Sequence, residues 1–208
     1  MGTDMLLMGQ TEHDLEQRVG TNRGCVEIII AGCNDPFHES DIAESRILLN
    51  NILKLPFGLE PYSSEKDQDK GVLYLLARYE DKLVGSARLV MDPSDETIEK
   101  SGLMSVVNTD YLRYAEVGSL TPHVALNMGL AVIKSYRKGV YGVHIASLLQ
   151  EERENIANQH NKQYILMRSR PAAAGVARRC GFTELSSETT PLPNGDSLVR
   201  SWFYKSLK

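Results

Sequence analysis

The chain has 208 residues, of which 42% are hydrophobic and 24% are charged, and its formal net charge is -4. That length and hydrophobic content suffice for one sizeable core, so we expect a single domain over residues 1–208, with 1–24 as a candidate N-terminal extension. The negative net charge argues against a nucleic-acid-binding protein, because such a protein needs a basic surface to displace counterions from the phosphate backbone.

Hydrophobic periodicity and turn residues predict strands and helices in a mixed order. In chain order the predicted elements are a strand (26–31), a helix (42–53), a loop (56–71), two strands (72–80 and 82–92), an acidic turn (93–101), two strands (112–120 and 127–134), a helix (140–160), a strand (163–169), a short helix (171–180) and a final strand (198–207). The strands on either side of Asp81 stand at hairpin spacing and should pair antiparallel.

The cysteines and the apolar segments limit the class further. Cys25, Cys33 and Cys180 form no CxxC pair, and no histidines stand at zinc-ligand spacing, so we expect reduced thiols and no metal site. The N-terminus lacks a basic segment followed by an apolar run, and nowhere do about 18 apolar residues follow one another. We therefore expect a cytoplasmic protein without a signal peptide or a transmembrane segment.

The stretch KSYRKGVYGVH, residues 134–144, joins a predicted strand to a predicted helix. Free backbone N–H groups and the positive end of the dipole make a helix N-terminus a phosphate site, and glycines let the backbone approach closely. Gly139 and Gly142 supply this freedom, while Lys134, Arg137 and Lys138 add positive charge. The stretch therefore predicts a phosphate-binding loop, with a solvated helix start as the alternative.

Two segments carry a first resemblance to a known family. GLAVIKSYRKGVYGVHIASLL (129–149) and RPAAAGVARRCGF (170–182) resemble signatures of the GCN5-related N-acetyltransferase superfamily, over about the C-terminal half of the chain. The resemblance implies a mixed α/β fold, with a central, mostly antiparallel sheet flanked by helices. It assigns to the acyl donor and its phosphopantetheine the residues Leu130, Ala131, Val132, Arg137, Lys138, Gly139 and Gly142. Val140 stands where the superfamily has a glycine.

A second resemblance involves residues 73–91 and 115–120, which are similar to acyl-homoserine-lactone synthases and N-acyl amino acid synthases. Those families take long acyl chains from acyl carrier protein. Ala115 replaces their tryptophan, and Gly118-Ser119 stand where Ser-Arg is usual, which favours amino-acid acylation over lactone synthesis. The resemblance implies acyl carrier protein as a partner, acyl-phosphopantetheine or acyl-CoA as co-substrate without a permanent cofactor, and an acceptor such as tyrosine. Lys134, Arg178 and Arg179 are predicted to form a patch for the acidic carrier.

Transfer of an acyl group to an amine needs a base for the ammonium proton and a clamp for the acceptor. Glu116, among apolar neighbours, is the predicted base; an outward-facing strand residue is the alternative reading, and His123 is the rival base. Arg88 is predicted to bind the acceptor carboxylate, because a guanidinium can bind two oxygens at once. An ion pair with Asp92 or Glu80 is the alternative role for Arg88, and Arg168 and Arg170 are alternative clamps.

The neighbouring Ser119 and Leu120 are also assigned to acceptor binding, whereas His144 is expected to pack on its helix. Either strand 112–120 or strand 127–134 could separate from the sheet to admit the thioester. The sequence thus predicts an N-acyltransferase that makes an N-acyl amino acid from a long-chain acyl carrier protein. The alternatives are an acetyl-CoA-dependent N-acetyltransferase of a small amine or protein, an acyl-homoserine-lactone-type synthase and a non-catalytic acyl-binding module.

Overall fold

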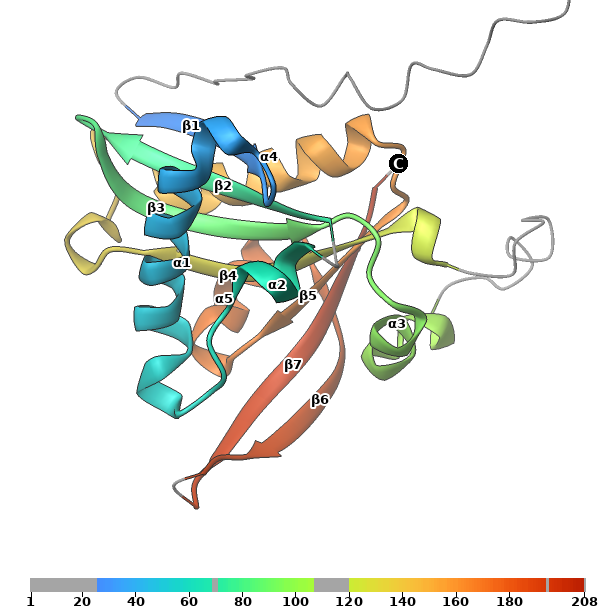
Figure 1. Cartoon of the computed structure of the whole chain (residues 1–208). Coiled ribbons are helices and arrows are strands. Elements are labelled where there is room, and N and C mark those ends of the chain that lie inside the picture. Colours follow the sequence, from blue (N-terminus) through green and yellow to red (C-terminus); the bar gives the residue numbers. More distant parts are fainter. Residues whose placement is uncertain (1–25, 69–70, 107–119, 194, 208) are drawn as a thin grey trace, which may run out of the picture.

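The computed structural model describes residues 26–68, 71–106, 120–193 and 195–207 (Figure 1). The strands of this part of the chain are β1 (Val26–Gly32), β2 (Val72–Tyr79), β3 (Lys82–Val90), β4 (Val124–Val132), β5 (Tyr164–Ser169), β6 (Thr183–Pro191) and β7 (Ser197–Ser206). The α-helices are α1 (Glu39–Leu53), α2 (Ser64–Gln68), α3 (Asp95–Ser101), α4 (Ile145–Gln159) and α5 (Pro171–Arg179). Short 3-10 turns, among them Thr121–His123 and Lys134–Tyr136, complete the described elements.

The strands form one sheet in the order β1-β2-β3-β4-β5-β7-β6. All neighbouring pairs are antiparallel except β4 and β5, which run parallel at the centre. The connection from β4 to β5 contains α4, as a parallel crossover requires. This arrangement confirms the predicted mixed, mostly antiparallel sheet with helices, and the predicted hairpin is β2 and β3.

Helices cover both faces of the sheet, and each face has its own apolar cluster. On one face α4 and α5 pack through residues such as Leu149, Ile156 and Ala177. On the other face α1 and the segment around α3 pack through Leu49 and Ile98. Figure 1 shows α1 in front of the sheet and α4 behind it. No helix in the described part of the chain is long and apolar enough to cross a membrane.

Three sequence expectations need correction. The stretch 56–71, expected as a loop, contains α2, and the acidic turn over 93–101 is the helix α3. The strand β6 was not expected, because its side chains are mostly polar and exposed, as is common on a strand at the edge of a sheet. The expected strand 112–120 lies outside the described residues, apart from Leu120.

Candidate active site

The two parallel strands at the centre of the sheet separate after a short pairing. β4 pairs with β5 only over Val124–Asn127, opposite Tyr164–Met167. Beyond this point β4 remains paired with β3, with a register shift at Gly129. A cavity of about 1000 Å³ occupies the space where the strands part. Of the two strands expected to open the sheet, the one over 127–134 corresponds to β4, and its pairing with β5 stops at the cavity.

The segment between β4 and α4, residues 134–144, is called here the donor loop. Gly139 has φ +92° and Gly142 φ +81°, and the loop is closed by two hydrogen bonds between Val140 and Val143, with N···O distances of 3.0 and 2.8 Å. The first helical bond of α4 runs from the Leu148 N–H to the His144 carbonyl, and the His144 side chain makes no cap. The preceding N–H groups of α4 therefore lack helical partners, which suits them for binding an anion.

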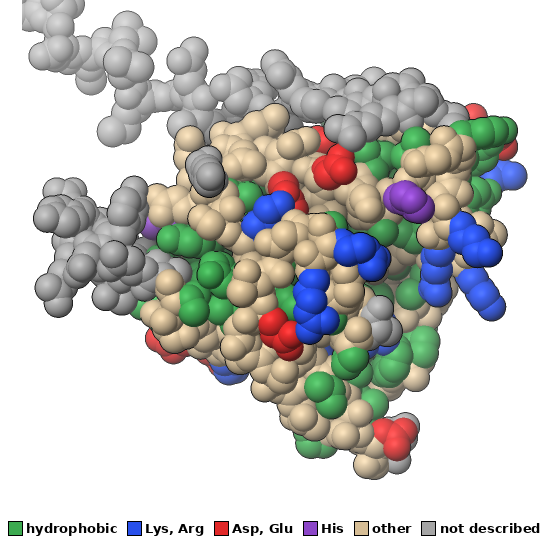
Figure 2. All heavy atoms as spheres, turned by 180° about the vertical axis from the view of Figure 1, so that it is seen from behind, with side chains coloured by type: hydrophobic (Ala, Val, Ile, Leu, Met, Phe, Trp, Pro, Cys, Tyr) green, Lys and Arg blue, Asp and Glu red, His purple; other side chains and the backbone are tan. Residues whose placement is uncertain are grey.

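The donor loop also carries positive side chains. Lys134, Arg137 and Lys138 are exposed, and among the described residues none of them has an ion-pair partner in the structure. Arg137 lines the cavity, and its Nε donates to the Val132 carbonyl at 3.1 Å. That bond fixes the guanidinium while its two terminal nitrogens stay available. Figure 2, which views the molecule from behind, shows Lys and Arg side chains gathered at the edge that carries this loop.

A buried polar network lies where β4 and β5 separate. The Gln150 Oε1 of α4 accepts from Asn127 Nδ2 at 3.1 Å and from Arg153 Nη2. Burial lowers the pKa of the Arg153 guanidinium to about 10, so it remains charged at neutral pH. All three residues line the cavity, and Asn127 Oδ1 and Arg153 Nε are buried and have no hydrogen-bond partner in the part of the chain that the structure describes. Buried polar atoms usually have partners, so these two are suited to a ligand.

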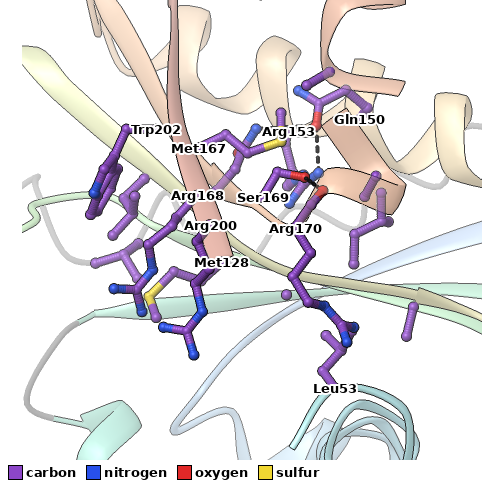
Figure 3. Close-up of a pocket in the computed structure, with 18 of the residues that line it drawn as sticks. Leu53, Met128, Gln150, Arg153, Met167, Arg168, Ser169, Arg170, Arg200 and Trp202 are labelled. Carbon is purple, nitrogen blue, oxygen red and sulfur yellow. Dashed lines mark hydrogen bonds between the residues drawn. The ribbon is translucent and has the colours of Figure 1, made fainter. Parts of the chain in front are cut away.

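Four cations line the other end of the cavity, which is called here the acceptor end: Lys54 after α1, Arg168 of β5, Arg170 before α5 and Arg200 of β7. Figure 3 shows the three arginine side chains extending to the same side of the cavity, while Gln150 and Arg153 lie on the opposite side. The sequence analysis named Arg168 and Arg170 only as alternatives and missed Lys54 and Arg200. The sequence of β7 contained a signal, because Arg200 shares one face of the strand with Leu198 and Trp202, both of which are buried.

The pKa of Lys54 offers a way to test the electrostatics of the acceptor end. Partial burial and the nearby Arg200 lower the pKa of its ammonium to about 8. Because the folded-state pKa lies below the ordinary value of 10.5, the charged ammonium destabilises the fold fully below pH 8 and ever less as the pH rises toward 10.5. We therefore expect Lys54→Met to raise the free energy of unfolding at pH 7 by about 1 kcal/mol, allowing for solvent screening.

Urea denaturation at pH 7 and at pH 9.5 measures this effect, and the gain should shrink at the higher pH. Lys82→Met is the matched control, because Lys82 is exposed at the start of β3 and does not line the cavity. A gain in Lys54→Met that is the same at both pH values would contradict the assignment.

Arg88, the predicted carboxylate clamp, is 2% exposed and does not itself line the cavity. Its Nη2 donates to the Asp67 carboxylate of α2, and its guanidinium lies 3.9 Å from the centre of the Tyr62 ring. The ion-pair partner is thus Asp67, and neither Asp92 nor Glu80 fills that role. Tyr62 separates Arg88 from the cavity, since that ring is part of the wall. Arg88 Nε and Nη1 have no partner among the described residues.

The remaining predicted residues are distributed as follows. Glu116 and Ser119 lie outside the described residues. Leu120 is buried, and neither it nor His123 lines the cavity. His144 is exposed at the start of α4, and the expectation that it packs was wrong. Arg178 and Arg179 are exposed on α5, where Arg178 pairs with Glu184 at 2.5 Å.

The cysteines that the structure describes form no disulfide. Cys33 and Cys180 are free and partly buried, and burial raises the pKa of the Cys180 thiol. Within the described ranges, no group of His, Cys, Asp and Glu side chains is arranged to hold a metal ion.

Several solved structures have a similar architecture at low sequence identity. NAA60 of Arabidopsis thaliana, solved in complex with acetyl-CoA, matches with a TM-score of 0.59 and 16% identity, over 86% of this chain and 98% of that one. An acetyltransferase of the GNAT family from Streptococcus pneumoniae gives 0.56 and 17%, over 87% and 100%. The yncA protein of Salmonella typhimurium, solved with its cofactor acetyl-CoA, gives 0.57 and 12%, over 89% and 95%.

No protein-family model and no curated protein matches the sequence. The structural likeness nevertheless defines the fold. The chain has the fold of the GCN5-related N-acetyltransferases, with the sheet opened between β4 and β5 and a glycine-containing loop leading into α4.

Proposed function

We propose that the chain is an N-acyltransferase that moves an acyl group from a phosphopantetheine thioester to the amine of a small amino acid. The observation that carries this proposal is the cavity between β4 and β5, with the donor loop at one end and cations at the other. Its volume of about 1000 Å³ is at the upper end of the range for small-molecule sites, roughly 300–1,000 Å³. There is room for a pantetheine arm, an acyl chain and an acceptor.

The donor binds along β4 and the donor loop. Beyond Asn127 the edge of β4 that faces β5 has no strand partner, so backbone groups of Leu130, Ala131 and Val132 can bond the amides of the pantetheine arm. The phosphate lies at the start of α4, with Arg137 and Lys138 beside it. In the finer form of the proposal, the donor is a long-chain fatty acyl carrier protein, which meets Lys134, Arg178 and Arg179. Opposite charges on the two surfaces would speed their encounter.

The reaction forms one C–N bond and breaks one C–S bond. The amine attacks the thioester carbon, negative charge develops on the carbonyl oxygen, the thiolate leaves and the ammonium proton passes to a base. Glu116 is the proposed base, supported by the resemblance of residues 115–120 to the synthase families. The buried cation Arg153 lines the cavity and would stabilise the negative charge that develops during transfer, since such charges interact strongly away from water.

A second candidate is an acetyl-CoA-dependent N-acetyltransferase acting through the same steps. It is favoured by the two structural neighbours solved with acetyl-CoA. The two candidates differ in the donor and in the use made of the apolar part of the cavity.

The test is turnover measured by mass spectrometry, with acetyl-CoA, a long-chain acyl-CoA and a long-chain acyl carrier protein each offered to a mixture of amino acids. We expect an N-acyl amino acid from the long-chain carrier, and a loss of roughly 100-fold or more in the Glu116→Gln variant. The variant must keep its circular dichroism spectrum and its CoA binding. Product from acetyl-CoA alone selects the second candidate. No product from any donor, with acyl-CoA bound, indicates a binding module and overturns the proposal.

A further inference from the structure

The acceptor end gathers positive charge from four separate elements. Lys54 follows α1, Arg168 is in β5, Arg170 precedes α5 and Arg200 is in β7. In Figure 3 the arginine side chains extend toward the region of Leu53 and Met128. Lys54, Arg170 and Arg200 are each partly buried. Cations that are brought together and partly withdrawn from water destabilise a protein unless an anion offsets them.

The protein's own carboxylates offset only part of this charge. Arg168 pairs with Glu188 at 3.0 Å, and Glu60 lies near Lys54. Among the described residues, no carboxylate lies within ion-pair distance of Arg170 or Arg200. Asp92 and Glu96 also line the cavity, but they pair with Lys162 and Lys100 respectively. Arg170 therefore has no ion-pair partner among the described residues, and Arg200 has only the longer-range attraction of Glu188, which already pairs with Arg168.

Aromatic rings hold two of the guanidinium groups in place without neutralising them. Arg170 lies 4.3 Å from the centre of the Phe57 ring, and Arg168 lies 5.3 Å from that of Trp202. A planar group fixed on a ring presents its N–H edge in a constant direction, which suits bidentate binding of a carboxylate or a phosphate. Burial and neighbouring cations lower the pKa of Lys54 and of Arg200, so a bound anion would stabilise both charges.

These charges do not serve the phosphate of the donor. The donor loop has its own cations and leads into α4, on the face of the sheet opposite to α1. Lys54, by contrast, follows α1, and its ammonium lies 4.3 Å from the centre of the Tyr62 ring. The anion at the acceptor end must therefore belong to the second substrate.

We propose that the acceptor is a small amine that carries two negative charges, which Lys54, Arg170 and Arg200 bind. The chemistry fits an amine with two carboxylates, such as glutamate or aspartate, or one with a phosphate monoester, such as O-phosphoserine. This inference rests on the proposed N-acyltransferase function and narrows its acceptor from amino acids in general to acidic ones. A neutral side chain such as that of tyrosine would leave part of the positive charge without a partner.

The experiment compares kcat/KM for matched acceptors with the thioester donor that supports turnover. The pairs are glutamate with glutamine, aspartate with asparagine, and O-phosphoserine with serine, with tyrosine added. We expect at least one acidic member to exceed its neutral partner by about tenfold or more, the size expected for one added charged contact. The glutamate and aspartate pairs test for a second carboxylate on the acceptor, and the O-phosphoserine pair tests for a phosphate. Equal rates within every pair, or a preference for tyrosine, would overturn the inference.

Substitutions at Arg170 and Arg200 test whether these two residues cause the preference for an acidic acceptor. Arg170→Gln and Arg200→Gln should each raise the KM for the acidic acceptor by about tenfold or more and the KM for its neutral partner by less, and Arg200→Lys should restore part of the effect. Lys82→Gln, an exposed lysine that does not line the cavity, is the control and should behave as the parent. An acidic preference that persists in both glutamine variants would contradict the assignment.

Binding without turnover separates this inference from the proposed function. Isothermal titration with glutamate, glutamine, O-phosphoserine and serine is carried out without a thioester. Selective binding of an acidic compound that is lost in Arg200→Gln, with no turnover from any donor, would keep the anion site and reject the transferase. Turnover of neutral amino acids without any binding of acidic ones would keep the transferase and reject the anion site.

Discussion

Replacing Gly139 with alanine is expected to weaken donor binding by about tenfold or more and to lower the free energy of unfolding by about 2 kcal/mol. The residue has φ +92°, and an added Cβ would lie 2.6 Å from the Val143 carbonyl oxygen. That oxygen is backbone and accepts the Val140 N–H at 3.0 Å, so the donor loop itself must move. Its displacement would misplace the N–H groups at the start of α4.

Gly142→Ala is the matched control for this substitution. Gly142 also has a positive φ, +81°, but no heavy atom lies within 4 Å of its added Cβ. It should therefore lose only about 1 kcal/mol of stability, from backbone strain, and keep most of its affinity for CoA. Isothermal titration with CoA and urea denaturation measure the two effects. Equal losses in the two variants would mean that the Val143 contact is not what Gly139 protects.

The parts of the fold that could be predicted from the sequence depend on local patterns. Apolar residues at turn spacing identified α1, and two strand-like runs around Asp81 identified the hairpin of β2 and β3. The glycines over 134–144 predicted a loop with close backbone turns, and Gly139 and Gly142 do have positive φ; the binding of a phosphate there stays a prediction. In each case the signal and the structure lie within the same short stretch of chain.

Three elements were missed, α2, α3 and β6, although α3 carried usable signals. Ser94 caps α3 by accepting from the Thr97 N–H, and Gly102 ends it in the left-handed conformation. The acidic composition of the segment led to the prediction of a turn in spite of these caps. β6 offered no comparable signal: it depends on pairing with β7 along its length, and strands at an edge tolerate polar side chains on both faces.

The acceptor end could be predicted only in part: the sequence indicates Arg168 and Arg170 as alternative clamps, but Lys54 and Arg200 lie far from them along the chain. Each of Lys54, Arg168, Arg170 and Arg200 taken alone resembles an ordinary surface cation. Only the order of the strands, with β5 between β4 and β7, brings Arg168 and Arg200 together. The partner of Arg88 was missed for the same reason, since Asp67 comes from a segment whose composition predicts a loop.

Replacing Asp67 with asparagine is expected to lower the free energy of unfolding by about 3–5 kcal/mol, the usual cost of leaving a buried charge without its partner. Asp67 is 1% exposed, and its carboxylate accepts from Arg88 Nη2, from the Tyr74 hydroxyl and from Arg46 Nε at 3.4 Å. Burial and the bond to Asp67 raise the pKa of Tyr74 to about 12, so the hydroxyl remains a donor. Without the carboxylate, two guanidinium groups would face each other unneutralised.

A double-mutant cycle measures this interaction. Arg88→Met alone should cost less than Asp67→Asn, because Asp67 would keep Arg46 and Tyr74, and the double variant should be more stable than Asp67→Asn. Guanidinium denaturation of the four proteins provides the free energies, and strict additivity would show that the two residues do not interact.

The same proteins decide between two roles for Arg88. As a clamp for the acceptor carboxylate, it would raise the acceptor KM when replaced by methionine, whatever residue stands at position 67. As the partner of Asp67, it acts through α2 and the Tyr62 ring that forms part of the cavity wall. On that basis the folded Arg88→Met protein should keep its acceptor KM within about threefold, whereas Arg200→Gln should not. We expect the second outcome, because Asp67 pairs with Arg88 Nη2 and Arg88 does not line the cavity.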